Sequence, residues 1–232
     1  MVVRKSAVCS LALAVAGLFS AALPTAQAQQ PVHHETNASR QARIARTINE
    51  TYAHRWEIFG GGGLLRFRPG SLLQDSNQVT WAASVNYFLS PRLYVKGDAR
   101  GEFGHAKVNS NPYNVYDPQI NEYNFLGGAG YRFYRTDKLA ISVEGLGGTA
   151  WGIFSGGAKA HPGTDLGIWK DGMKPAFSAG VNFDYNFYPD LAFRVTPTYV
   201  GTMFTSAPGT PSVTLQNNFG FNAGILYRFG RQ

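Results

Sequence analysis

The chain has 232 residues, of which 44% are hydrophobic and only 15% are charged, against about 25% charged residues in typical soluble domains. Its 27 glycines, its 14% aromatic content and a mean hydropathy just below zero disfavour an ordinary soluble core and fit a sheet spread thinly through a membrane. The formal net charge of +7 could attract nucleic acid, but no basic stripe is interleaved with stacking aromatics, so we expect no nucleic-acid partner.

Residues 1–28 have the parts of a secretory signal peptide. Arg4 and Lys5 precede an apolar run at residues 7–23, and Ala26-Gln27-Ala28 supplies small residues for cleavage. A membrane anchor is the alternative, which the short run disfavours. Cleavage would lower the formal charge from +7 to +5, because this segment holds no Asp or Glu. It would also remove Cys9, the single cysteine, so we expect neither disulfides nor thiolate chemistry.

Residues 29–54 form a polar N-terminal segment that we place in the periplasm. Asn37 is a good N-cap type, and no Pro or Gly follows it before residue 55, so the segment could be helical. Such a helix would have a narrow apolar stripe made by Ile44, Ile48 and Tyr52. It would also have a basic side made by Arg40, Arg43 and Arg46. A helix resting on the membrane or the barrel rim and a weakly ordered linker both stay open. His33-His34 lacks a third ligand, so we expect no metal.

From residue 55 onward, apolar and small or polar residues alternate with the period of β-strands. Eight strands are predicted, at residues 56–67, 78–89, 93–103, 123–133, 139–153, 177–187, 191–199 and 217–229. The glycines at 60–63 are expected to interrupt the first strand and to let neighbouring backbones approach closely. Pro197 removes a ladder donor, which predicts a local irregularity in the seventh strand.

The connections alternate strictly between long loops and short turns. Long loops fall near residues 68–77, 105–121, 155–174 and 206–213, and short turns at 90–92, 135–137 and 188–190. This asymmetry is typical of outer-membrane barrels, and an even strand number puts both termini on the periplasmic side. We therefore predict an all-β fold: an eight-stranded antiparallel up-and-down transmembrane β-barrel over residues 55–232, with a short N-terminal extension that is either a helix or a linker.

The two faces of these strands differ in kind. One set is large and aliphatic or aromatic, as a lipid-facing band requires; the other is mostly Gly, Ala, Ser, Thr and Asn with isolated charges, which suits a crowded interior. The interior set is predicted to hold five acids and five bases, namely Glu57, Asp98, Glu102, Glu144 and Asp184 with Lys96, Arg100, Arg132, Arg194 and Arg228. Unpaired buried ions cost several kcal/mol each, so we predict a paired network that plugs the barrel.

The same charges could be catalytic, because paired carboxylates and arginines gather at active sites. A plugged interior, however, gives a substrate no access. A lipid A-modifying enzyme would need a nucleophile and a base close together, and neither His105 nor His161 has a strand serine nearby. We therefore expect no enzyme activity, no catalytic residues and no cofactor.

The last strand ends in the alternation Phe219, Phe221, Ala223, Ile225, Tyr227, Phe229. It resembles the C-terminal strand of bacterial outer-membrane barrels, and by that resemblance Phe221, Tyr227 and Phe229 form the signal read by the barrel assembly machinery. The family pattern usually stops on the aromatic itself, whereas Gly230-Arg231-Gln232 follows here.

Residues 55–229 as a whole resemble the small outer-membrane β-barrel family typified by the transmembrane domain of OmpA and by OmpX. The resemblance implies a monomeric envelope protein with a structural or surface-interaction role, in contact with outer-membrane lipids and lipopolysaccharide. Loop lysines at positions 107, 159, 170 and 174 could meet its anionic head groups, or could simply be solvated. A narrow channel for small or hydrophobic solutes and an outer-membrane enzyme on lipid A remain the alternatives.

Overall fold

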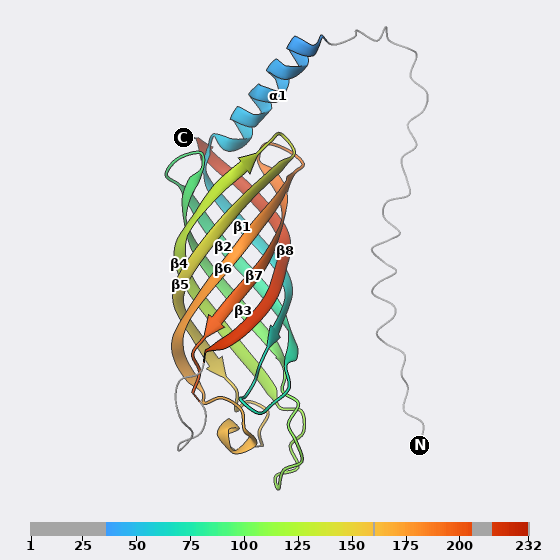
Figure 1. The fold of residues 1–232 in the computed structure, drawn as a ribbon, viewed down its shortest axis with the longest axis vertical. Coiled ribbons are helices and arrows are strands. Elements are labelled where there is room, and N and C mark those ends of the chain that lie inside the picture. The colour runs from blue at the N-terminus through green and yellow to red at the C-terminus, as the bar shows by residue number, and fades with distance from the viewer. Residues whose placement is uncertain (1–35, 160, 206–214, 232) are drawn as a thin grey trace, which may run out of the picture. The chain divides into compact units, whose positions relative to one another are not determined.

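The computed structural model describes residues 36–159, 161–205 and 215–231. The predicted signal peptide, His33-His34 and most of the fourth loop lie outside the described residues. Helix α1 (Asn37–Tyr52) comes first, and a 3-10 helix, η2 (Gly163–Leu166), lies between the fifth and sixth strands (Figure 1). The strands are β1 (His54–Phe67), β2 (Ser76–Phe88), β3 (Leu93–His105), β4 (Gln119–Arg135), β5 (Leu139–Ile153), β6 (Gly172–Asn186), β7 (Leu191–Thr202) and β8 (Gln216–Arg231).

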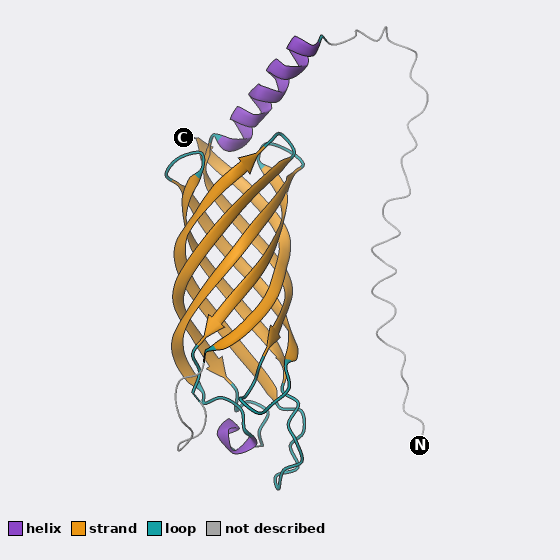
Figure 2. Cartoon of the chain, in the orientation of Figure 1, coloured by secondary structure: helices purple, strands orange, loops and turns teal. Residues whose placement is uncertain are grey.

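The eight strands form one closed antiparallel barrel. Each strand pairs with the next in the chain, and β8 pairs with β1 to close the sheet. Short turns gather at one end of the barrel and long loops at the other (Figure 2). The predicted fold class is confirmed, and α1 decides the N-terminal extension in favour of a helix. In the part of the chain that the structure describes, no helix is long and apolar enough to cross a membrane.

The predicted interruption of the first strand is wrong. β1 runs unbroken through Gly60–Gly63 and pairs there with both β2 and β8, because a ladder needs only backbone groups. The predicted close approach is present: a side chain on Gly63 would collide with the Phe221 carbonyl oxygen. The expected irregularity at Pro197 is also confirmed, since pairing of β6 with β7 stops at Gly180–Thr198 and resumes at Phe183–Val195.

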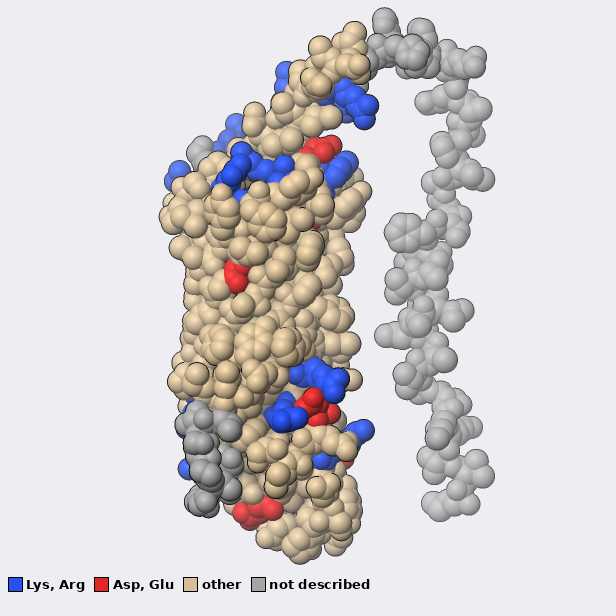
Figure 3. All heavy atoms as spheres, in the orientation of Figure 1, with Lys and Arg blue, Asp and Glu red and all other residues tan. Residues whose placement is uncertain are grey.

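The barrel wall presents its apolar set outward. Along β2 every second residue is buried, while the residues between them, such as Val79 and Trp81, are exposed. On the face that Figure 3 shows, blue and red atoms gather toward the two ends, and the band between them is tan apart from one red patch. A belt with so few charged atoms is what a lipid bilayer requires of a barrel's outer surface.

The interior is filled differently at different heights. Toward the short-turn end and the middle it is lined by buried charged and amide side chains. At the loop end, apolar side chains of strands and loops form one core, which includes Leu65, Phe67, Ile120, Phe154, Leu166, Ile168, Trp169 and Phe204. This apolar plug was not predicted, because half of it comes from loop segments without strand periodicity.

Candidate functional site

A cluster centred on Glu57 lies at the short-turn half of the interior. Its carboxylate meets three guanidinium groups, at 2.5 Å from Arg132, 2.9 Å from Arg228 and 3.2 Å from Arg194. Arg194 also reaches Asp184 at 2.6 Å from the neighbouring strand. These side chains are almost completely buried and come from β1, β4, β6, β7 and β8, so the cluster ties opposite walls of the barrel together.

A second cluster lies deeper along β3. Lys96 contacts Glu144 at 2.7 Å and Asp98 at 3.3 Å, and Arg100 contacts Asp98 at 2.5 Å. Asn182 donates a further hydrogen bond of 2.6 Å to Glu144. With the first cluster, these contacts give nine of the ten predicted interior charges an ion-pair partner.

The tenth predicted charge, Glu102, is an exception to the predicted pairing. It is buried, but no ion pair joins it to any described residue. Directly opposite it on β4 lies Glu122, a buried acid that was not predicted. The predicted balance of five acids and five bases is therefore wrong, because six carboxyl groups and five cationic side chains are fully buried among the described residues. The amide of Asn124 donates to both carboxylates, at 3.2 and 3.0 Å.

Tyr52, the last residue of α1, closes the short-turn mouth of the barrel. Its hydroxyl donates to the carbonyl of Thr136 at 2.7 Å and accepts a bond of 3.0 Å from Asn186. The Arg132 and Arg228 guanidinium groups lie 4.9 and 5.8 Å from its ring centroid, so the ring covers the Glu57 cluster. Burial raises the pKa of the Tyr52 phenol above its ordinary value, against the opposing effect of the Asn186 bond. The sequence predicts Tyr52 only as part of the apolar stripe of a helix, and does not predict its contact with the barrel mouth.

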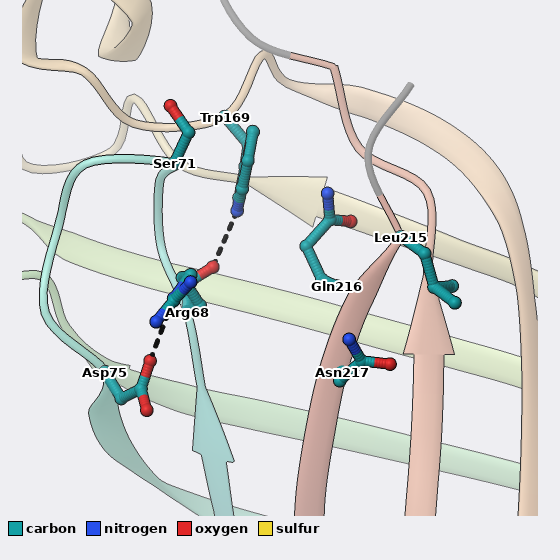
Figure 4. Close-up of a pocket in the computed structure, with 7 residues that line it drawn as sticks. All are labelled: Arg68, Ser71, Asp75, Trp169, Leu215, Gln216 and Asn217. Carbon is teal, nitrogen blue, oxygen red and sulfur yellow. Dashed lines mark hydrogen bonds and ion pairs between the residues drawn. The ribbon is translucent and has the colours of Figure 1, made fainter. Parts of the chain in front are cut away.

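A surface pocket of about 350 Å³ lies at the loop end (Figure 4). The lining residues are Arg68, Ser71 and Asp75 from the loop after β1, Trp169 from the loop before β6, Leu215 just before β8, and Gln216 and Asn217 from the start of β8. The indole of Trp169 donates to the Arg68 carbonyl at 2.6 Å, and the side chain is buried.

Asp75 holds two arginines at the edge of this pocket. Arg66 and Arg68 contact its two carboxylate oxygens at 3.0 and 3.1 Å, while their side chains remain 68% and 55% exposed. Partial burial acts to raise the pKa of Asp75, but the hydrogen bonds from Arg68 and Arg66 outweigh it and hold this pKa below its ordinary value. The result is a fixed, exposed basic group above the apolar belt.

The three predicted assembly residues lie on the outer face of β8. Phe221, Tyr227 and Phe229 are exposed, and Phe229 stacks on Tyr227 and on Trp56 of β1, with centroids 6.1 and 6.4 Å apart. β8 continues past the aromatic to Arg231, with Gly230 in a left-handed conformation at φ 69°. Their recognition by an assembly machinery stays a prediction.

These features define a small eight-stranded β-barrel of the outer-membrane type, with a buried salt-bridge network in its interior. Residues 34–231 match the family model described as a protein of unknown function, DUF481, and the chain belongs to that family.

Solved structures share the fold at low identity. Neisserial surface protein A (NspA) is 12% identical with a TM-score of 0.52, covering 75% of this chain and 97% of its own. OprG from Pseudomonas aeruginosa is 10% identical with a TM-score of 0.51, covering 76% and 96%. The attachment invasion locus protein Ail of Yersinia pestis is 17% identical with a TM-score of 0.45, covering 76% and 99%. Comparison with curated proteins found no match.

Proposed function

We propose that this chain is a non-enzymatic integral protein of the bacterial outer membrane, closed to solutes, with a structural or surface-interaction role and both termini in the periplasm. One observation carries the proposal: the interior is occupied at three successive heights. Tyr52 covers one mouth, the ion-paired clusters fill the middle, and the apolar core around Phe154 and Trp169 fills the loop end. A barrel of eight strands has an interior just wide enough for side chains to fill, so we infer that the described side chains leave no continuous water-filled path.

Planar-bilayer recording tests this closure. The purified, folded protein is expected to insert without a stable open conductance, with folding checked by the electrophoretic shift between unheated and boiled samples. A variant with Tyr52→Ala, Phe154→Ala and Trp169→Ala, which loosens both ends, serves as the comparison. A steady conductance of the natural sequence would favour the channel alternative instead.

The outer surface offers a contact for anionic head groups of lipopolysaccharide. Arg66 is the second-last residue of β1 and Arg68 follows the strand, two and four residues after the exposed Leu64; Asp75 holds both, with most of their surface free. Replacing both arginines with Gln is expected to weaken binding to lipopolysaccharide vesicles, and the loss should shrink with added salt. Arg40→Gln with Arg46→Gln, on the helix, is the matched control, and an equal loss in that control would contradict a specific contact.

The enzyme alternative has its own test. Overexpression of the protein in a Gram-negative host is expected to leave the mass spectrum of lipid A unchanged. A new lipid A species that depends on His105 or His161 would overturn the non-enzymatic proposal.

A further inference from the structure

Two acids without an ion-pair partner lie in the loop half of the barrel, away from the two ion-paired clusters. Glu102 and Glu122 face each other across β3 and β4 and are 1% and 0% exposed. With them, the described residues hold six fully buried carboxyl groups against five fully buried cationic side chains. Leaving two neighbouring carboxylates uncompensated in a dry interior would be costly, so a positive charge has to be supplied there.

Several buried oxygen atoms of these two acids and of neighbouring residues have no hydrogen-bond partner. Glu102 Oε2, Glu122 Oε2 and Asn124 Oδ1 are buried and unpartnered, although the Nδ2 of Asn124 already bonds to both acids. Gln78 is fully buried with both amide atoms unpartnered, and its side chain lies over Gly104, two residues from Glu102. Four unpartnered acceptor oxygens therefore lie on the adjacent strands β2, β3 and β4, and the one unpartnered donor of these residues is the Nε2 of Gln78.

Among the described residues, no Lys or Arg side chain forms an ion pair with Glu102 or Glu122. Arg100, two residues from Glu102, is engaged with Asp98 at 2.5 Å and with Thr198, and Lys96 is engaged with Glu144 and Asp98. Lys174 is half-buried on β6, opposite Ala150, but no ion pair joins it to either acid in the described chain. Thr80 on β2 and Asn222 on β8, which complete the ring, are uncharged and bond to each other at 2.6 Å.

We propose that Glu102, Glu122, Asn124 and Gln78 form an internal binding site for one small monovalent metal cation of the sodium type. A single positive charge balances the six fully buried carboxyl groups against the five fully buried cationic side chains of the described residues, whereas a divalent ion would leave an excess. Carboxylate and amide oxygens are the ligands that hard cations prefer. A proton would bond to only one or two of the four oxygens. Ile120 and the apolar core lie beyond the site toward the loops, so the ion is taken up as the barrel folds.

Refolding in different salts tests the site. The full-length mature protein is folded from urea into detergent in sodium chloride or in choline chloride at equal ionic strength, and unfolding is followed by the electrophoretic shift. With sodium at a hundred times its Kd, the folding equilibrium is expected to favour the native state by about a hundredfold more than in choline. Glu122→Gln, which equalises the charges, should remove the difference between salts. Glu50→Gln, the same change on the exposed face of α1, should preserve it.

Two results would overturn the proposal. Equal stability of the natural sequence in sodium and choline would show that no metal ion is bound. An infrared band of a protonated carboxylic acid that disappears in Glu122→Gln would show that a proton supplies the charge. If Glu122→Gln fails to fold, Gln78→Leu replaces it, since it removes one oxygen ligand and keeps both acids; it is expected to reduce the sodium effect several-fold.

Discussion

Glu57 shows how a single residue can hold a small barrel together. Its carboxylate is shared by Arg132, Arg194 and Arg228, and no other acid lies within bonding distance of Arg132 among the described residues. Glu57→Gln keeps the shape but leaves buried guanidinium groups short of negative charge. We expect the free energy of unfolding to fall by about 3–5 kcal/mol, measured by urea titration in detergent. The same change at exposed Glu50 should alter stability by less than about 0.5 kcal/mol, and comparable losses in both variants would contradict the central role of Glu57.

Through Asp75, on the surface at the loop end, the stability of the folded state depends on pH. Because its folded pKa is depressed by Arg66 and Arg68, the ion pair stabilises the folded state above the ordinary carboxyl pKa, about 3.9. That contribution is lost as the pH falls through the lower folded pKa. An NMR titration of the Asp75 carboxyl should therefore show a midpoint below that of a model peptide. Arg66→Gln with Arg68→Gln should move the midpoint upward, and an unchanged midpoint would contradict the contact.

The interior residues were predictable because strand period fixes the direction of each side chain, and all ten predicted charges are buried. Glu122 was missed because the fourth strand was predicted to start at residue 123, whereas β4 begins at Gln119. Extending the same alternation by one residue would have found it. The role of Tyr52 could not be predicted, because it depends on how a helix end meets the turns of strands distant in sequence.

At the scale of elements, Pro197 interrupts the contact between β6 and β7. Pairing with β8 continues through this residue, while pairing with β6 is absent for residues 181–182. Pro197→Val restores an N–H and should let the ladder close, adding about 1 kcal/mol of stability. Slower hydrogen exchange at the amides of Val181 and Asn182 is the direct measurement. Unchanged exchange there would mean that the gap has a cause other than the missing donor.

Helix α1 is joined to the barrel through its last turn, where Thr51 and Tyr52 are buried while most of the helix is exposed. Tyr52→Phe removes the bonds to Thr136 and Asn186 but keeps the ring over the arginines, and is expected to cost about 1 kcal/mol. Tyr52→Ala removes the ring as well and should cost about 3–5 kcal/mol. Urea unfolding separates the two, and equal losses would show that the ring contributes nothing.

The two ends of the closed barrel differ in loop length, so the orientation of the whole molecule in the outer membrane can be tested. Three short turns lie at the end where α1 and the C-terminus also lie, and the long loops lie at the other end (Figure 1). In outer-membrane barrels the short turns are periplasmic and the long loops are extracellular. Insertion from the periplasm would therefore leave both termini and the short turns of this chain on the periplasmic side. The only cysteine, Cys9, falls in the predicted signal peptide, so the mature chain offers a cysteine-free background for labelling.

Gln74→Cys and Lys138→Cys place one thiol at each end. Gln74 is exposed in the loop between β1 and β2, and Lys138 is exposed in the turn between β4 and β5. A maleimide that cannot cross membranes should label the first variant in intact cells and the second only after the outer membrane is permeabilised. Both positions carry polar, exposed side chains, so neither substitution should disturb folding. Labelling of Lys138→Cys in intact cells, with Gln74→Cys protected, would mean the opposite orientation, and would move the Arg66–Arg68 contact to the periplasmic leaflet.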